Sequence, residues 1–273
     1  MLKYLDVTDL KRIETHLLHA LGQFCQEHNL RYFLTYGTLI GAIRHQGFIP
    51  WDDDIDVMMP RKDYEYLVAN FNRNRPAANV SVLSHSIDKR YYLPLAKLVD
   101  TTTVLKEDVT SDYEIGVYLD IFPLDNLSDD FEEARARIAK AFRYNRMLLI
   151  KTATWRKGRA LVKNLALVAG KVLLSTTSVS RLLEKMDRFC REKESDTFTQ
   201  YVGVMAGISG GDDSRVFRRE WFEQEMIVTF EGAKYPAPVG ADDLLRKIYG
   251  DYMQLPPEDC RVSHHSFEAW MKE

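Results

Sequence analysis

The segment from Asp54 to Val57, in which acidic and apolar residues alternate, constrains the fold more than any other part of the sequence. Successive side chains of a β-strand point to opposite faces. Asp54 and Asp56 would therefore project together from one face, while Ile55 and Val57 would enter a hydrophobic core. Two carboxylates held on one edge by an apolar anchor form a natural site for a hard cation. The pattern predicts a strand that carries a metal-binding acid pair.

The residues around this strand suit the binding of a phosphate group. Gly37 would let the backbone approach a phosphate closely, and a helix that begins near Gly37 and Thr38 would offer N–H donors to the anion. Arg44 could form bidentate hydrogen bonds with phosphate oxygens, or could simply be a surface arginine. Asp52 could supply an outer contact in the site, or could cap an exposed turn. We predict that these four residues contact the substrate.

A third acid is predicted to complete the site. Asp120 stands alone among the apolar residues of 115–122, and an acid buried in a strand is costly without a partner or a metal. The alternative is a turn hydrogen bond at the strand end, because residues 123–126 are expected to close this strand. Metal ions that neutralise phosphate charge are held by such acids in phosphoryl and nucleotidyl transfer. We therefore predict that Asp54, Asp56 and Asp120 are the catalytic residues and bind Mg²⁺ or Mn²⁺.

Two further residues are candidates for substrate binding, and each has an alternative interpretation. Lys97 lies in an otherwise apolar strand, where it could be a second phosphate contact or could point to solvent from a sheet edge. His264, near the C-terminus, could assist substrate binding or a proton transfer. A structural role is the commoner one for a single histidine in that position.

The order of predicted elements favours an α/β (α+β) fold with a mixed sheet, flanking helices and a helical insertion. Residues 1–128 are expected to form a catalytic core in the order helix, strand, turn, acidic strand, helix and several strands. Residues 129–200 read almost entirely as helix and form a basic lobe. Residues 201–273 return to mixed structure and are expected to pack back on the core, so that the chain forms one compact unit.

Charge and hydropathy limit the partners of the chain. The net charge of −3 gives no case for a nucleic-acid partner. The basic lobe is different, because residues 135–171 contain eleven Lys and Arg with hardly an acid. That charge is either a solvated helical face or a surface for an acidic polymer or anionic lipid headgroups. No signal-peptide pattern or spanning apolar stretch is visible, and three widely spaced cysteines favour a reducing compartment, so we expect a cytoplasmic location.

The run from Gly37 to Val57, GTLIGAIRHQGFIPWDDDIDV, resembles the LicD family of phosphotransferases, which includes the fukutin-related proteins. Two later segments look like further motifs of that family: Phe230-Glu231-Gly232, and Tyr249 to Met253 followed by Leu-Pro-Pro. The resemblance covers the N-terminal half, to about Asn126, and roughly the last fifty residues. The basic helical lobe is covered only loosely.

The resemblance implies a nucleotidyltransferase-type core and a divalent-metal-dependent enzyme. Bacterial members of the family are similar in moving phosphocholine from CDP-choline to a hydroxyl of teichoic acid or lipopolysaccharide glycans, with release of CMP. Position by position, Asp54 and Asp56 match the metal-binding pair, and Gly37 and Thr38 match the turn before it. Asp120 falls where the family has a further acid.

Two other hypotheses remain open beside phosphocholine transfer. The same core could use another CDP-linked donor, to transfer ribitol or glycerol phosphate, or could perform nucleotidyl transfer. A non-catalytic module that binds a nucleotide or a membrane is the third interpretation. A lipid-linked glycan acceptor would place an enzyme of this kind at the inner membrane surface, where the basic lobe would favour peripheral contact.

Overall fold

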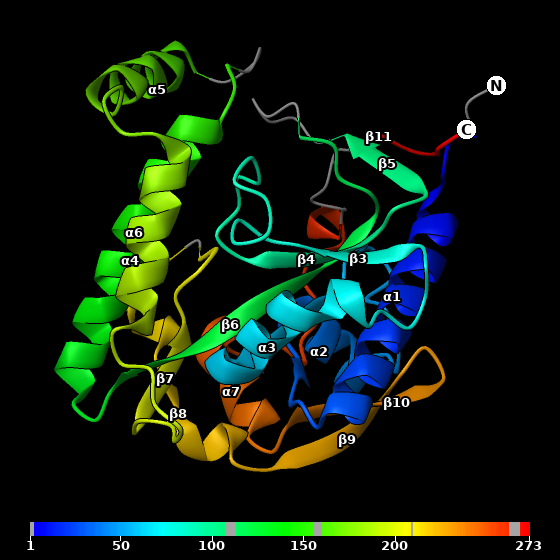
Figure 1. The fold of residues 1–273 in the computed structure, drawn as a ribbon. Coiled ribbons are helices and arrows are strands. Elements are labelled where there is room, and N and C mark those ends of the chain that lie inside the picture. The colour runs from blue at the N-terminus through cyan, green and yellow to red at the C-terminus, as the bar shows by residue number, and fades with distance from the viewer. Residues whose placement is uncertain (1–2, 107–112, 156–159, 209, 262–267) are drawn as a thin grey trace.

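The computed structural model describes residues 3–106, 113–155, 160–208, 210–261 and 268–273. A mixed sheet crosses the middle of the molecule, with helices packed around it, which confirms the mixed α/β class (Figure 1). The helices are α1 (Val7–His28), α2 (Tyr36–Arg44), α3 (Arg61–Asn70), α4 (Phe131–Thr152), α5 (Leu161–Leu173), α6 (Val179–Arg191) and α7 (Ala241–Tyr249).

The sheet that carries the acidic strand contains seven strands. They are β1 (Phe33–Leu34), β2 (Asp56–Pro60), β3 (Val80–Leu83), β4 (Ala96–Asp100), β6 (Tyr118–Ser128), β7 (Tyr201–Val204) and β8 (Phe217–Arg218). The order is β1-β2-β6-β4-β3, and β7 pairs with the far end of β6 and with β8. β2 and β6 run parallel, whereas the other neighbours run antiparallel.

Two small antiparallel pairs lie outside this sheet. β9 (Glu225–Phe230) pairs with β10 (Ala233–Pro238), and β5 (Thr103–Lys106) pairs with β11 (Glu268–Met271). The second pair joins the middle of the chain to its C-terminal end, so that both termini lie near the same edge of the molecule (Figure 1).

β6 is longer than the sequence indicates, because it continues through Pro123 to Ser128. The expectation that residues 123–126 close the strand is therefore wrong. Asp120 donates its N–H to the carbonyl of Ile55, towards β2, so the backbone nitrogen of Pro123 faces the opposite edge. On that edge the pairing with β4 ends at Ile121 and the pairing with β7 begins at Leu124. Pro123 lies between these two pairings, where no neighbouring strand of the described chain accepts a hydrogen bond from its position. Its missing N–H therefore removes no hydrogen bond from the sheet.

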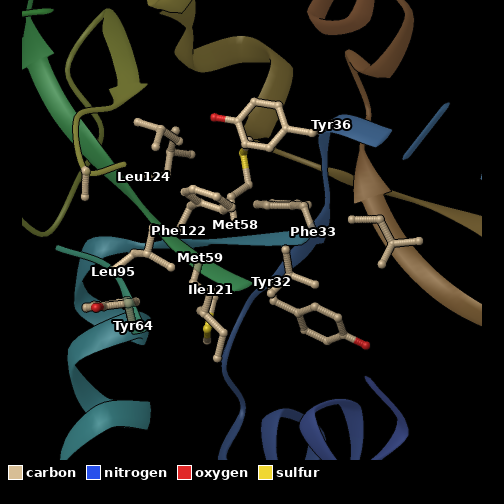
Figure 2. Close-up of a cluster of buried hydrophobic side chains, with 14 of the residues drawn as sticks. Tyr32, Phe33, Tyr36, Met58, Met59, Tyr64, Leu95, Ile121, Phe122 and Leu124 are labelled. Atoms are coloured by element: carbon tan, nitrogen blue, oxygen red, sulfur yellow. The ribbon is translucent and has the colours of Figure 1, made fainter. Parts of the chain in front are cut away.

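The central strands are covered on both faces. Ile55 and Val57 are fully buried, as the alternating pattern predicts, whereas Asp56 is only partly buried. In Figure 2, Met59 and Ile121 point towards Tyr64 of α3, and Met58 and Phe122 point to the opposite side, towards Tyr36. Asp56 is two residues before Met58, and Asp120 is two residues before Phe122. Both acids therefore project from the face of the sheet on which Tyr36 lies.

The helical segment after β6 shares the main hydrophobic core with the sheet. Ala134, Ile138 and Ala141 of α4 and Leu182 and Met186 of α6 are buried in the same cluster as the residues of β2 and β6. α5 is different, because it lies at the end of α4 and α6 that is remote from the sheet (Figure 1). None of the described helices is long and apolar enough to cross a bilayer.

Candidate active site

Three charged side chains lie side by side across the centre of the sheet. Asp56 at the start of β2 is the register partner of Asp120 in β6, and Asp120 is in turn the register partner of Lys97 in β4. Register partners on neighbouring strands project from the same face of a sheet. Lys97 Nζ lies 2.7 Å from Oδ1 of Asp120. The structure thus brings together the predicted third acid, one member of the acid pair and the predicted lysine.

The acid pair itself spans the entry to the strand. β2 begins at Asp56, and Asp54 lies in the connection just before it rather than in the strand. Burial raises the pKa of the Asp56 carboxyl well above its usual range, and the charges of Asp54, Asp120 and Asp52 raise it further. Lys97 opposes this effect. Three other carboxylates therefore disfavour the charged form of Asp56, and Lys97 partly compensates.

The start of α2 lies against this cluster. The Oγ1 atom of Thr38 accepts a 2.8 Å hydrogen bond from the N–H of Asp56, which ties the helix to the acidic strand. A Cβ atom at Gly37 would lie 2.5 Å from Oδ2 of Asp52, so a larger residue here would displace the Asp52 carboxylate. α2 begins at Tyr36, slightly earlier than predicted, and the first turn of a helix has N–H groups without intrahelical acceptors. Gly37, Thr38 and Asp52 are therefore placed together, as the sequence suggested.

Tyr36 holds a backbone conformation that bulky residues rarely adopt. Its φ angle is 48°, in the left-handed region, where a non-glycine residue is strained. The ring packs edge-on against Phe122 of β6, with centroids 5.2 Å apart. Burial raises the pKa of its phenol to about 12, although the nearby Arg215 guanidinium opposes the shift. The strained turn thus directs a neutral hydroxyl towards the face of the sheet that carries the acids.

Arg215 is a functional candidate that the sequence analysis missed. It lies in the short segment between β7 and β8, and its guanidinium carbon is 5.4 Å from the centroid of the Tyr36 ring. Its Nε is buried and has no hydrogen-bond partner in the part of the chain that the structure describes. No motif marks this arginine, because only the return of the chain to the edge of β6 brings it here.

Tyr249 shows what the C-terminal motif contributes. This last residue of α7 is 47% exposed, yet its hydroxyl end is buried enough to raise the phenol pKa, and the charge of Asp56 raises it further. Tyr36 and Asp52 also act on it, while Arg215 opposes the shift. The motif quoted from the sequence therefore supplies an aromatic side chain to the acidic site.

The other late motif holds the loop before the acidic strand. Glu231 Oε1 accepts a 3.1 Å hydrogen bond from the N–H of Phe48, and the N–H of Glu231 donates to the carbonyl of Gln46 at 3.0 Å. A Cβ atom at Gly47 would lie 2.2 Å from the same carboxylate oxygen. The Phe48 and Phe230 rings stack beside it with centroids 5.0 Å apart. This motif therefore fixes the connection between α2 and β2.

Arg44 lies at the end of α2 remote from Gly37, about 10 Å along the helix. Its Nη1 donates to the carbonyl of Tyr252, and its Nε lies 2.9 Å from Nε2 of His45. These contacts hold the segment after α7 against α2. A phosphate contact by Arg44 stays a prediction, and His264 lies outside the described residues.

Lys97 is buried, with 3% of its surface exposed, in a strand that has neighbours on both sides. The alternative in which it points to solvent from a sheet edge is therefore wrong. Its ammonium group also lies 3.1 Å from the centroid of the Tyr118 ring, a cation–π arrangement. Paired in this way, Lys97 keeps one oxygen of Asp120 engaged.

Glu14 is a second residue that the sequence analysis missed. It lies on the apolar stripe of α1, four residues after Leu10 and three before Leu17, and is 4% exposed. Burial raises the pKa of its carboxyl well above the usual range, and the charges of Asp54 and Asp53 add to the shift. Its Oε2 makes no hydrogen bond within the described chain. An acid at a core-facing helical position was the signal that could have identified it.

The donor chemistry of this cluster fits a hard divalent cation. Carboxylate oxygens are the ligands that Mg²⁺ and Mn²⁺ prefer. Burial, and then the charges of Asp54, Asp120 and Asp52, raise the pKa of Asp56, so a bound cation would stabilise its charged form. Among the described residues, however, no three acidic, histidine or cysteine side chains are already placed as a coordination shell. Binding of a metal would require the carboxylates to rotate, with Asp120 held by Lys97.

Two cavities lie elsewhere in the molecule. One of about 660 Å³ is lined by residues of α3 and α6, among them Arg61 and Asp187, and one of about 480 Å³ lies beside the ends of β2 and β6. Neither is lined by Asp54, Asp56 or Asp120. The carboxylate cluster therefore lies apart from these two cavities.

Comparison with known proteins agrees with this geometry. A family model described as LicD/FKTN/FKRP, nucleotidyltransferase domain, matches residues 29–139, which include β1, α2, β2 and Asp120. The whole chain is similar to the lipopolysaccharide cholinephosphotransferase LicD of Haemophilus influenzae, with 27% identity over 282 aligned residues. That alignment covers 99% of this chain and 100% of the relative. The chain therefore contains a LicD-family domain at residues 29–139, and over its full length it is similar to a LicD protein.

The LicD-family domain and the similarity to a cholinephosphotransferase confirm the prediction that the chain is a transferase-type enzyme. Two shorter matches are to uncharacterized proteins of Rickettsia. The one in Rickettsia prowazekii is 46% identical over 51 residues, or 19% of each chain. The one in Rickettsia typhi is 49% identical over 47 residues, or 17% of this chain and 15% of the relative. These matches are local and support no statement about substrate.

Proposed function

We propose that this LicD-family protein transfers phosphocholine from CDP-choline to a hydroxyl of a cell-surface glycan precursor, with release of CMP. The observation that carries the proposal is the alignment of Asp56, Asp120 and Lys97 in one register across three strands. The similarity to the lipopolysaccharide cholinephosphotransferase of Haemophilus influenzae over almost the whole chain supports the choice of phosphocholine and of a glycan acceptor.

The acids would hold the metal on which the reaction depends. Asp54, Asp56 and Asp120 supply the carboxylate oxygens, with Asp52 next to them at the start of α2. A divalent cation bound there would neutralise charge on the phosphate oxygens of the donor. Because Lys97 already engages one oxygen of Asp120, the second oxygen is the one we assign to the metal.

The cationic and N–H groups around the cluster would orient the diphosphate. The backbone at Gly37 and Thr38 opens the first turn of α2 towards the acids. Arg215 has a buried Nε without a partner in the described chain, and a guanidinium pairs well with phosphate oxygens. We therefore assign Arg215 to the diphosphate, in place of the more distant Arg44.

The acceptor hydroxyl must lose a proton as the new phosphate ester forms. A general base works best when its pKa is close to the working pH. Burial and the neighbouring acids raise the pKa of Asp56 well above the usual range of an aspartate, which makes its carboxylate a stronger base. An Asp56 carboxylate not fully engaged by the metal would then take the proton of the sugar hydroxyl.

Tyr249 is our candidate for part of the choline site. Quaternary ammonium groups bind over aromatic faces, and the ring of Tyr249 is half-exposed beside Asp56 and Asp52. The carboxylates would add electrostatic attraction for the choline cation.

The acceptor would be lipid-linked, which places the enzyme at the cytoplasmic face of the membrane as a peripheral protein.

The direct test is CMP release from CDP-choline by the purified protein with Mg²⁺ and a glycan acceptor. Asp54→Asn, Asp56→Asn and Asp120→Asn should each reduce turnover by about a hundredfold or more. Asp196→Asn is the matched control, because that acid is exposed and paired only with Lys62 at the surface. Full activity in Asp54→Asn and Asp56→Asn would refute the metal assignment.

The donor is tested in the same assay. CDP-ribitol and CDP-glycerol would release CMP if the enzyme transfers another phospho-alcohol, and a nucleoside triphosphate would release pyrophosphate if it performs nucleotidyl transfer. A clear preference for one of these over CDP-choline would replace the phosphocholine assignment while leaving the acid site intact. No product from any donor would favour a non-catalytic binding module.

A further inference from the structure

α5 presents apolar side chains to solvent along almost its entire length. A surface helix of a globular protein normally turns its apolar stripe inward. In α5 the apolar side chains face outward instead, and the polar Asn164 is the buried residue of the helix. The exposed apolar residues, with their exposed fractions, are Leu161 (63%), Val162 (76%), Leu165 (54%), Val168 (46%), Val172 (66%) and Leu173 (82%).

These residues form one continuous face. At about 100° per residue, they occupy an arc of about 160° together with two alanines. The opposite side rests on α4, because a Cβ atom at Gly170 would lie 2.9 Å from Cγ2 of Ile150. Lys151 Nζ also donates to the carbonyl of Leu174 at 3.2 Å. The helix is therefore attached to the rest of the protein on one side and exposes its apolar side outward.

Two large apolar side chains of the segment before α5 are exposed as well. Leu149 in the last turns of α4 is 65% exposed, and Trp155 is 53% exposed. We call the exposed apolar face of α5, with Leu149 and Trp155, the α5 surface. Its position is terminal, since α5 lies at the far end of the α4 and α6 pair from the sheet (Figure 1). Contiguous apolar surface of this kind marks an interaction site rather than an ordinary solvated face.

The charge around the α5 surface indicates what covers it. The sequence from 134 to 183 contains no Asp or Glu, whereas Lys and Arg recur throughout it. Lys163 lies between Val162 and Leu165, and Lys171 lies in the last turn. Three more cations, at 156, 157 and 159, belong to the sequence that joins α4 to α5. The partner should therefore be both apolar and negatively charged.

We propose that α5 lies in the interface of an anionic membrane, with its apolar face among the acyl chains and its lysines near the headgroups. At 13 residues the helix is about 20 Å long, and it is too short to span a bilayer, which requires about 20 residues. Helices with one apolar face and a lysine-rich border bind in the plane of the interface. Tryptophans such as Trp155 are favoured at headgroup level.

A second copy of the chain is a poorer partner for the α5 surface. Two such surfaces would bring two acid-free, lysine-rich segments together, and like charges repel. A membrane with anionic lipids satisfies both the apolar and the cationic part of the surface. The inference makes the membrane location in the proposed function specific to one helix, but it does not depend on which donor or acceptor the enzyme uses.

The test is co-sedimentation of the full-length protein with vesicles of phosphatidylcholine, alone or with about 25% phosphatidylglycerol. The test variant is Leu165→Gln/Val172→Gln, which keeps helix-forming residues on α5. The control is Ile227→Gln/Leu255→Gln, which removes two exposed apolar side chains from β9 and the C-terminal segment. We expect wild type and control to bind the anionic vesicles, and the α5 variant to bind about a hundredfold more weakly.

Other outcomes would overturn the proposal. Equal vesicle binding by wild type and the α5 variant would exclude the apolar face, and equal binding to neutral and anionic vesicles would exclude the role of charge. Absence of vesicle binding together with dimers that the α5 variant abolishes, measured by analytical ultracentrifugation, would assign the surface to a second copy. CMP release by the same variants, assayed without vesicles, separates this question from the proposed chemistry and should be unchanged.

Discussion

Asp56 of β2 and Asp120 of β6 are direct register partners on parallel strands, although they are far apart in the sequence. Because both project from the same face, each raises the free energy of the other's charged form. Lys97 on the next strand compensates for part of that repulsion through its contact with Asp120. The resulting cluster is short of positive charge, which a metal ion or a cationic substrate can supply. This relationship leads to the following predictions.

Asp56→Asn should make the protein more stable and less active at neutral pH. The folded-state pKa of Asp56 is raised, so its ionisation costs stability once the pH is above the ordinary aspartate range. Differential scanning fluorimetry should show a higher Tm for the variant without added metal. Mg²⁺ or Mn²⁺ should raise the Tm of the wild type and leave that of the variant nearly unchanged. A metal-induced shift of equal size in both proteins would contradict the assignment.

Lys97→Met should destabilise the protein by about 3–5 kcal/mol, because it leaves Asp120 partly buried without its cation. Urea denaturation would measure the loss. The double variant Lys97→Met/Asp120→Asn removes both charges and should recover most of the stability, although it should be inactive. If the double variant is as unstable as the single one, the Lys97–Asp120 pair is not the source of the loss, and the packing of Lys97 on Tyr118 would explain it instead.

Glu14→Gln should alter the pH dependence of stability. The pKa of Glu14 is raised in the folded protein, so the folded state retains a proton that the unfolded chain releases. The contribution of Glu14 therefore falls as the pH rises from the ordinary glutamate range through the folded pKa, by up to about 1.4 kcal/mol per pH unit. In urea titrations, the free energy of unfolding of the variant should increase relative to that of the wild type from pH ~4 to pH ~8. Glu27→Gln, an exposed acid of the same helix, should show no such gain.

Arg215→Gln should lower kcat/KM for the CDP-linked donor by about tenfold to a hundredfold, since hydrogen bonds to charged groups contribute about 1.5–3 kcal/mol. Arg215→Lys should recover part of the loss, because it keeps the charge and removes the bidentate geometry. Steady-state kinetics with the donor varied would measure both. An unchanged KM and kcat in Arg215→Gln would remove this arginine from the donor site.

Arg44→Met distinguishes a structural from a phosphate-binding arginine. The hydrogen bond from Arg44 to the Tyr252 carbonyl predicts a fall in Tm and little change in the KM for the donor. A donor contact, as the sequence suggested, predicts the reverse. Thermal unfolding and donor kinetics on the same preparation would decide between them.

Much of the site could be predicted because its signals are local. The alternation of Asp54, Ile55, Asp56 and Val57 predicted their alternating burial correctly, although β2 begins only at Asp56. Asp120 was identifiable because a single acid among apolar residues needs a partner. The environment of Lys97 was not predictable, since its sequence fits both an edge strand and an inner one. β4 lies between β6 and β3, which makes that lysine a buried ion-pair partner.

The sequence by itself determined the type of chemistry, because the residues that bind metal and phosphate lie close together in one motif. It also determined that residues 129–200 are basic and that most of their described part is helical. Only the tertiary structure decided which side chains from other parts of the chain lie beside this motif, because strand register and the course of the loops depend on long-range packing. These side chains are Glu14, Arg215 and Tyr249. Packing alone also decided that the apolar side of α5 faces outward. The periodicity of the sequence predicts an apolar face on a helix, but not whether that face points to the core or to solvent.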